Sequence, residues 1–441
     1  MPIFEQIEYA GQTDVGVRRS HNQDAYTVVT AHSDQAWQMH GHIFIVADGM
    51  GGHAVGEKAS VKASRDIPLL FQKYADEGPA TALRKAFSEA NFSIYTIGQE
   101  NPEFKGLGTT GSMLVLRPDG AWIGHVGDSR IYRIRDDHIE QLTFDHSYVW
   151  EMARRMRISP DKVKGVKSNV IIRSLGPESM VNVDVEGPHP LRPNDTFVLC
   201  SDGLSNLVSE QEIGLIVSAL PPKEACQLLI DFANLRGGPD NITVIIVRVL
   251  DLQTPESPPR ISPLKQIYDV LRRVPWPIWT MISAVILLLL SVNLFMMQVP
   301  GARFVFVLAL ALVIVGFVGL AVQNRQPQEE VLINDSPPGK LHIYRRFDCK
   351  LDETFLTRLE KGEESLIEKL RENDWKYDEA KYRQHSEAAK EAFAKGDWPA
   401  CLRERCRAVS VLARVYNKHR QHEESFSPKW DTVKASHDSN A

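Results

Sequence analysis

The sequence predicts an α+β fold with antiparallel strands for residues 1–253, followed by two long apolar helices and an all-helical C-terminal region. Short runs rich in β-branched residues alternate in the first part with longer segments of helical period, which is typical of mixed strands and helices. Two successive hairpin patterns imply antiparallel pairing, because only antiparallel strands can be joined by a tight turn. Beyond residue 253 the strand-like runs give way to apolar and then to charged helical segments.

Within residues 1–253, strands alternate with pairs of helices. The expected elements are, in chain order, helices over 54–74 and 79–98, hairpins of 112–116 with 121–126 and of 131–134 with 138–142, and helices over 210–220 and 222–236. Pro79 suits a first helical turn, and Gly237-Gly238 suits a helix end. The interval 145–176 is polar and is expected to be irregular.

Aspartates stand at the ends of the strands that are expected to be buried. They are Asp48 after 43–47, Asp128 after 123–126, Asp202 after 196–201 and Asp240 before 242–247, and Asp24 adds a fifth acid near Arg19. Carboxylates gathered in this way would repel one another unless cations bound between them. Two metal ions that share one acid would lower the pKa of a water between them and clamp a phosphoryl group. For Asp48 alone, a tight strand-to-helix turn capped by an aspartate is the alternative interpretation.

Taken in order, these motifs resemble the metal-dependent protein-serine/threonine phosphatases called PPM or type 2C, in their bacterial form. The resemblance covers residues 8–250 and rests on Arg19…Asn22-Gln23-Asp24, Asp48-Gly49-Met50-Gly51-Gly52, Gly108-Thr109-Thr110, Gly127-Asp128-Ser129-Arg130, Ser201-Asp202-Gly203 and Asp240-Asn241. It implies a β-sandwich of two antiparallel sheets flanked by helix pairs. It also implies that 145–176 holds a mobile flap beside the active site, whose positive charge would steer phosphopeptides; a solvated loop is the alternative.

The resemblance implies a role for each metal-site residue. Asp48 would bridge two Mn²⁺ or Mg²⁺ ions, with the Gly49 carbonyl on one ion and Asp202 and Asp240 on the other. Asp24 would orient metal-bound waters from outside the ligand shell. A hydroxide bridging the two ions would then attack phosphorus directly, without a phosphoenzyme.

Two further residues take roles by resemblance. Arg19 would hold the phosphate oxygens, since its guanidinium presents a planar fork of donors. Asp128 would join Asp202 at a third, weaker metal site near the flap, unless it is a turn acid that pairs with Arg130.

The sequence departs from the family pattern at two positions. Met50 stands where many eukaryotic relatives carry a histidine suspected of protonating the leaving alcohol, so the general acid is unassigned. Gln23 replaces a glutamate common in relatives. His53 and His146 are the histidines nearest the motifs, and both are expected to be structural.

Composition limits the other classes of function. A net charge of -5 over 441 residues argues against nucleic-acid binding, which normally needs a basic surface. The 5 cysteines are scattered, so we expect reduced thiols in a cytosolic setting. Residues 1–30 contain no apolar run of the kind found in a signal peptide.

A membrane hairpin is expected over 275–323, after a Pro-rich linker at 254–274. Residues 276–297 and 304–322 are nearly free of charge, and each is about long enough to span a bilayer. The positive charges at 265, 272, 273 and 325 outnumber Arg303 in the turn, so both ends are expected in the cytoplasm. Gly316 and Gly319 lack the G-x-x-x-G spacing and are interpreted as ordinary membrane glycines.

A second linker is expected at 324–340, a charged helical region at 341–424 and a disordered tail at 425–441. The helical hairpin expected over 378–419, with its turn at Gly396-Asp397-Trp398, partly resembles one tetratricopeptide unit. Such a unit rarely stands alone, so it would pack on its own N-terminal helix, dimerise or bind a partner; a plain helical stalk is the other interpretation.

Together these observations predict a membrane-anchored phosphatase that acts on phosphorylated proteins. By family analogy, a Ser/Thr kinase in the same membrane or its substrates are the expected partners. The alternative is a catalytically weak, phosphatase-like scaffold that acts through partner binding by the C-terminal helices. The presence of all five metal-site acids argues against that alternative.

Overall fold

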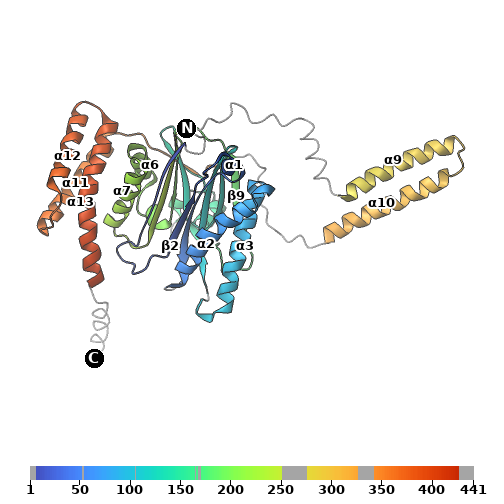
Figure 1. Cartoon of the computed structure of the whole chain (residues 1–441), viewed down its shortest axis with the longest axis horizontal. Helices are drawn as coiled ribbons and strands as arrows, with labels where there is room; N and C mark the ends of the chain where they lie inside the picture. The colour runs from blue at the N-terminus through green and yellow to red at the C-terminus, as the bar shows by residue number, and fades with distance from the viewer. Residues whose placement is uncertain are drawn as a thin grey trace. The chain divides into compact units, whose positions relative to one another are not determined.

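The computed structural model describes residues 6–51, 54–104, 106–163, 165–166, 170–250, 276–325 and 342–426. These residues form two compact units, one from 1–253 together with 336–441 and one from 254–335. The C-terminal helical region therefore belongs to the same unit as the N-terminal domain (Figure 1).

Two antiparallel sheets form the centre of the first unit. One sheet has the order β1-β11-β10-β7-β8-β12, with β1 Ile7–Asp14, β11 Ile242–Val249, β10 Thr196–Cys200, β7 Arg130–Arg135, β8 His138–Gln141 and β12 Arg345–Asp348. The other has the order β2-β3-β5-β6-β9, with β2 Asp24–Val29, β3 His42–Met50, β5 Gly111–Arg117, β6 Gly120–Val126 and β9 Asp184–His189, while the short β4 Gly108–Thr109 pairs with β3. Side chains from both sheets, such as Phe44 and Phe197, share one buried cluster. The predicted antiparallel sandwich is thus confirmed.

A pair of helices covers the outer face of each sheet. Helices α2 Ala54–Lys73 and α3 Pro79–Glu100 bury Ile67 and Phe87 against the sheet that contains β3. Helices α6 Glu210–Ala219 and α7 Pro222–Leu235 cover the other sheet (Figure 1). All four helices lie within two residues of their predicted limits, because their apolar period and their end signals agree.

The interval 145–176 is more ordered than expected. It contains helix α4 Tyr148–Met156, which Ser147 caps by accepting a hydrogen bond from the Trp150 amide, and the short η4 Pro160–Lys162. Trp150 is buried and holds the helix against the domain. The expectation of an irregular segment was wrong over Tyr148–Met156, because a single buried face on nine residues leaves little periodic pattern.

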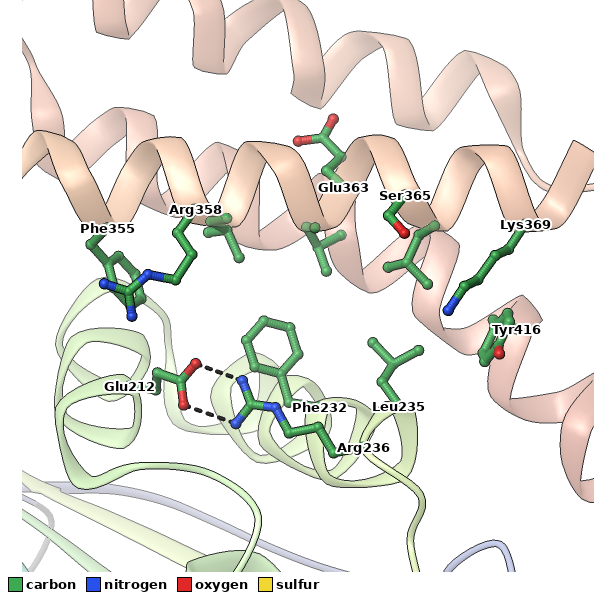
Figure 2. A pocket seen from close by; sticks show the side chains of 14 residues that line it. Glu212, Phe232, Leu235, Arg236, Phe355, Arg358, Glu363, Ser365, Lys369 and Tyr416 are labelled. Atoms are coloured by element: carbon green, nitrogen blue, oxygen red, sulfur yellow. Dashed lines mark hydrogen bonds and ion pairs between the residues drawn. The ribbon is translucent and has the colours of Figure 1, made fainter.

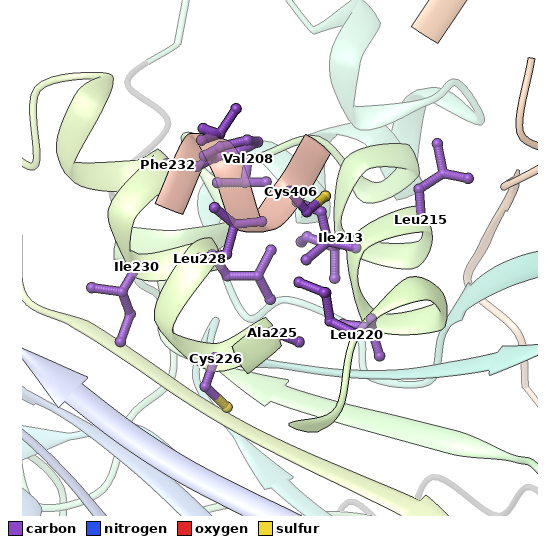
Figure 3. Close-up of a cluster of buried hydrophobic side chains, with 14 of the residues drawn as sticks. Val208, Ile213, Leu215, Leu220, Ala225, Cys226, Leu228, Ile230, Phe232 and Cys406 are labelled. Atoms are coloured by element: carbon purple, nitrogen blue, oxygen red, sulfur yellow. The ribbon is translucent and has the colours of Figure 1, made fainter. Parts of the chain in front are cut away.

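The C-terminal region is helical from Glu353 onward, as predicted, with α11 Glu353–Glu372, α12 Glu379–Ala394 and α13 Trp398–Phe426. It packs on α6 and α7 of the N-terminal domain. Cys406 of α13 lies in one buried cluster with Val208, Ile213 and Leu228 (Figure 3). Helix α11 also faces α7: its Phe355 points toward the N-terminal domain, where Phe232 and Leu235 of α7 lie (Figure 2).

Polar contacts reinforce this packing. The Arg407 guanidinium lies 2.8 Å from the Glu224 carboxylate of α7, and the Asn417 amide donates to the Asp231 carbonyl at 3.1 Å. The Arg403 side chain donates to the carbonyl of Ala219 at the end of α6. The C-terminal helices are therefore an integral layer of this unit.

The second unit contains helices α9 Trp276–Met296 and α10 Ala302–Arg325, which pack against each other. Both are long and apolar enough to cross a membrane by length and composition. A Cβ added at Gly316 would come within 2.6 Å of Met281, so this glycine permits close helix contact. The predicted linkers 254–274 and 324–340 and the tail 425–441 lie almost wholly outside the described residues.

Candidate metal centre

Asp48 lies near the end of β3, directly opposite Asp24 in the β2–β3 ladder. The Asp48 amide donates to the Thr110 hydroxyl at 2.8 Å, and the Asp48 carbonyl accepts from the Thr110 amide and from the Thr109 hydroxyl. These bonds fix the backbone, so the half-buried Asp48 carboxylate is held at the edge of the sandwich.

Gly49 follows in the same strand and is packed too closely for any side chain. A Cβ on Gly49 would lie 2.2 Å from the carbonyl oxygen of Gly56, and a Cβ on Gly56 would lie 2.7 Å from the carbonyl oxygen of Gly49. The two glycines let the start of α2 approach β3 at the site. The part played by Gly56 was not predicted.

Asp24 is held from the opposite sheet. One of its carboxylate oxygens accepts from the Ser201 hydroxyl at 2.7 Å, and the Ser201 oxygen accepts from the Thr243 amide at 3.0 Å. The other oxygen, Oδ1, is buried and has no hydrogen-bond partner.

Asp202 and Asp128 also present buried oxygens without partners. Asp202 is the first residue of the short α5 Asp202–Ser205, and Asp128 follows Gly127, whose positive φ turns the chain after β6. The Oδ1 atom of each accepts no hydrogen bond. Arg130 pairs with Asp145 at 2.8 Å and with Glu210 at 3.4 Å, so the alternative of an Asp128–Arg130 pair was wrong.

Asp240 and Arg19 form an ion pair at the rim of the site. The Arg19 Nη2 lies 2.9 Å from the Asp240 Oδ2, and the two side chains are 47% and 36% exposed. Asn241 anchors this rim, since its amide donates to the carbonyls of Val15 and His21 and its oxygen accepts from the Gln23 amide.

Electrostatics shows that these acids gather in one place. The pKa of Asp24 is raised to about 7, mainly by burial and with smaller contributions from the charges of Asp202 and Asp240. Burial also raises the pKa of Asp48, to which Asp24, Asp202, Asp128 and Asp240 add. The other four predicted acids are thus all within electrostatic reach of Asp48.

The same effect reaches the far side of the cluster. Burial and then the charge of Asp202 raise the pKa of Asp128 to about 8, and burial and then the charge of Asp240 raise the pKa of Asp202. Without a compensating cation, Asp128 would therefore hold a proton at neutral pH.

The donor set fits hard divalent ions. Three acids of the cluster, Asp24, Asp128 and Asp202, each have a buried carboxylate oxygen without a hydrogen-bond partner. A bound Mn²⁺ or Mg²⁺ would satisfy such oxygens and would offset the repulsion between the acids. In the described part of the chain, no three His, Cys, Asp or Glu side chains converge to enclose one ion by themselves. Ions of this kind usually keep several waters in their coordination shell, so the acids need not enclose an ion by themselves.

No role was predicted from the sequence for the hydroxyl side chains that hold the acid-bearing segments in place. Thr110 shares a hydrogen bond of 2.7 Å with Ser129, and this pair links the Asp48 strand to the Asp128 turn. Both residues stand within the motifs quoted for the resemblance, which was the available signal. His146 accepts from the Gly127 amide and pairs with Asp184 at 2.9 Å, so its structural assignment is confirmed. His53 lies outside the described residues.

A cavity of about 260 Å³ opens beside Asp128 and Asp202 and is bounded on its other side by α4 and η4. A second cavity of about 260 Å³ lies between α11 and α6–α7 and contains none of the metal-site acids (Figure 2). The first cavity is therefore the one that adjoins the candidate metal centre.

Comparison with known proteins identifies relatives of the N-terminal domain. Residues 11–161 match the family described as protein phosphatase 2C. The serine/threonine phosphatase stp of Listeria welshimeri is 37% identical over 242 residues, which are 54% of this chain and 93% of that protein.

Solved structures match over the same region. The crystal structure of a bacterial serine phosphatase is 29% identical and covers 56% of this chain and 99% of its own, with a TM-score of 0.50. The catalytic domain of the phosphatase PstP, solved with two manganese ions, is 30% identical over 56% of this chain and 99% of that one, with a TM-score of 0.47. The chain belongs to the bacterial branch of the protein phosphatase 2C family, the metal-dependent protein-serine/threonine phosphatases that work with Mn²⁺ or Mg²⁺.

Proposed function

We propose that this protein removes phosphate from phosphoserine and phosphothreonine side chains of proteins at the Asp48 cluster. The observation that carries the proposal is the gathering of Asp24, Asp128, Asp202 and Asp240 within electrostatic reach of Asp48, with buried oxygens on Asp24, Asp128 and Asp202 that have no hydrogen-bond partner. When bound, two Mn²⁺ or Mg²⁺ ions would supply a hydroxide between them for direct attack on phosphorus and would neutralise the charge of the phosphoryl group.

Asp48 and the Gly49 carbonyl would hold one ion, and Asp48, Asp202 and Asp240 the other. Asp24 would act through the waters of the centre, since the Ser201 hydroxyl holds one of its oxygens and leaves the other free. Asp128 with Asp202 would form the third, weaker site. Water is consumed, the P–O bond to the serine or threonine oxygen breaks, and the alcohol and inorganic phosphate leave.

Arg19 would bind the phosphate. Its guanidinium is paired with Asp240 at 2.9 Å and nearly half exposed, so it can turn toward a phosphate oxygen without crossing the core. Its place at the rim, next to a proposed ligand, suits it for positioning the substrate.

We also propose that α9 and α10 anchor the enzyme in a membrane with both flanking regions in the cytoplasm. Residues 342–426 pack onto the N-terminal domain, so the chain segments before α9 and after α10 belong to one folded unit. This supports a topology in which both ends of the hairpin lie on the same side of the membrane. A Ser/Thr kinase or its substrates in that membrane are the proposed partners. The scaffold alternative, with the tetratricopeptide-like helices α12–α13 as a binding module, requires no metal at the acids.

The test uses the full-length chain in detergent micelles and a phosphothreonine peptide, with phosphate release measured in Mn²⁺ and in chelator. We expect release only with metal and a loss of about 1,000-fold or more in Asp48→Ala, since the change removes the acid shared by both ions. Metal-independent release, or no release from a folded and metal-loaded chain, would favour the scaffold alternative.

A further inference from the structure

Arg345 belongs to β12, the strand contributed by the chain after the α9–α10 hairpin, and its side chain is nearly buried at 13% exposure. Its Nη2 lies 2.8 Å from the carboxylate of Asp161 in η4, and its Nη1 lies 3.3 Å from Glu210 at the start of α6. The guanidinium also lies over the ring of Trp150 in α4, 5.9 Å from its centre. One side chain thus contacts both structured parts of the interval 145–176 and the body of the domain.

A chain of charged contacts connects this side chain to the metal-site wall. Glu210 lies 3.4 Å from Arg130, and Arg130 lies 2.8 Å from Asp145. Asp145 and Asp128 line the same cavity, so the two acids lie near each other.

Arg345 also forms part of the wall of the cavity beside the metal centre. Asp128 and Asp202 line this cavity of about 260 Å³ on one side, and Trp150, Asp161 and Arg345 line it on the other. Among the described residues, the recorded ion-pair partner of Asp161 is Arg345, which comes from the part of the chain after the hairpin.

The β12 strand is well anchored in this place. It pairs with β8 over Arg345–Asp348, and the Cys349 amide donates to the Asp137 carbonyl at 2.7 Å. The Tyr344 hydroxyl donates to Glu186 of β9 at 2.5 Å. These contacts fix the strand on the edge of the sheet, next to the flap.

We propose that Arg345 is a positioning residue that clamps the flap, here residues 148–163, against the catalytic domain. The clamp shapes the cavity in which the residues flanking the phosphorylated side chain bind. The segment that follows the apolar hairpin is in this way part of the substrate site. The predicted effect on peptide kinetics rests on the proposed phosphatase function, whereas the contact between Arg345 and the flap does not depend on it.

The chain offers a matched control, because Arg346 is the next residue of the same strand and points to the opposite face. It is 53% exposed, and within the described part of the chain it forms an ion pair of 3.6 Å with Glu140. The variants to compare in the full-length chain are Arg345→Ala, Arg345→Lys, Arg346→Ala and Asp161→Asn. The last removes the flap end of the clamp at a side chain that is 66% exposed, where misfolding is not expected.

Each variant is assayed with a phosphothreonine peptide and with p-nitrophenyl phosphate, and the hydrogen exchange of 148–163 is measured. We expect Arg345→Ala and Asp161→Asn to raise the peptide KM by about 10-fold while changing kcat on the small ester less than about 2-fold. Both should speed exchange in the flap, Arg345→Lys should restore part of each effect, and Arg346→Ala should leave them unchanged.

Equal effects of Arg345→Ala and Arg346→Ala would overturn the proposal, because they would reflect the strand rather than the clamp. Unchanged flap exchange in both Arg345→Ala and Asp161→Asn would also overturn it. If the wild-type chain released no phosphate from either substrate, the proposed function would fail, while flap exchange would still decide the clamp.

Discussion

The acidic side chains that suit the site for cations also lower the stability of the metal-free fold. Burial raises the pKa values of Asp24 to about 7 and of Asp128 to about 8, and it raises that of Asp48 as well. A carboxyl group whose pKa is higher in the folded than in the unfolded state stabilises at low pH, and this contribution is lost as the pH rises through the folded value. At neutral pH, the metal-free site therefore destabilises the fold.

We expect Asp48→Asn to raise the unfolding midpoint of the metal-free protein at pH 7.5 and to abolish the stabilisation by Mn²⁺. The reason is that the amide removes one charge from the repelling cluster and, on the proposed assignment, the ligand that both ions share. Thermal unfolding with and without Mn²⁺ measures both effects. A lower metal-free midpoint with undiminished Mn²⁺ stabilisation would contradict this reading of the cluster.

Asp231 provides a pH prediction away from the metal centre. Burial raises its pKa to about 7, although Gln227 and Asn417 donate to it and Arg414 lies 4.0 Å away. The stabilisation from its neutral form is complete below pH 3.8 and is lost as the pH rises through about 7. We expect Asp231→Asn to stabilise the chain by about 1–2 kcal/mol at pH 8 and little at pH 5. Denaturant unfolding at the two pH values measures this, and an equal change at both would contradict it.

Sequence reasoning reached the acids but not their supports. Asp48, Asp128, Asp202 and Asp240 were found because each stands at an apolar strand end, and the structure brings them within electrostatic reach of one another. The Arg19–Asp240 pair and the hydroxyl contacts of Ser201 and Thr110 join residues far apart in sequence, and no local pattern encodes such contacts.

Elements with a strong period were predicted well, and short edge elements were missed. Helix α7 has an apolar face and a double-glycine end, and its predicted limits hold. Strand β12 is only Arg345–Asp348, charged at three of four positions, and it is a strand because β8 offers an open edge. Strands β1 and β9 were missed for a similar reason, since their residues are mostly half-exposed and lack a continuous apolar run.

Helix α6 carries a test of how the C-terminal region docks. A Cβ at Gly214 would lie 2.3 Å from the Cys349 sulfur, whereas a Cβ at Gly362 in α11 would meet nothing within 4 Å. We expect Gly214→Ala to destabilise the chain by about 1–3 kcal/mol and to speed hydrogen exchange in β12, through overpacking. The control Gly362→Ala should stabilise by up to about 1 kcal/mol through helix propensity. Equal effects of the two substitutions would contradict the close contact.

At the scale of the whole molecule, the chain leaves its N-terminal domain, forms the apolar hairpin and returns to complete the same unit. The helices after the hairpin supply buried residues such as Leu366, Leu402 and Cys406 to the cluster that covers α6 and α7. A chain cut at residue 253 would expose that apolar surface to water.

We expect the fragment 1–253 to unfold roughly 5–10 °C below the full-length chain and to bind a hydrophobic dye more strongly, because it loses a packed layer. The matched comparison is a full-length chain in which a soluble linker replaces α9 and α10, which keeps that layer. An unchanged midpoint in the fragment would mean that the C-terminal helices contribute little to the fold.

The location of the metal ions is the measurement that tests the central claim most directly. Crystals of the full-length chain loaded with Mn²⁺ would be examined by anomalous diffraction at the manganese edge. We expect two strong peaks that share Asp48, one beside the Gly49 carbonyl and one beside Asp202 and Asp240, and both should vanish in Asp48→Asn. Peaks that avoid Asp48, or peaks that persist in Asp48→Asn together with turnover, would contradict the assignment of this cluster as the catalytic metal centre.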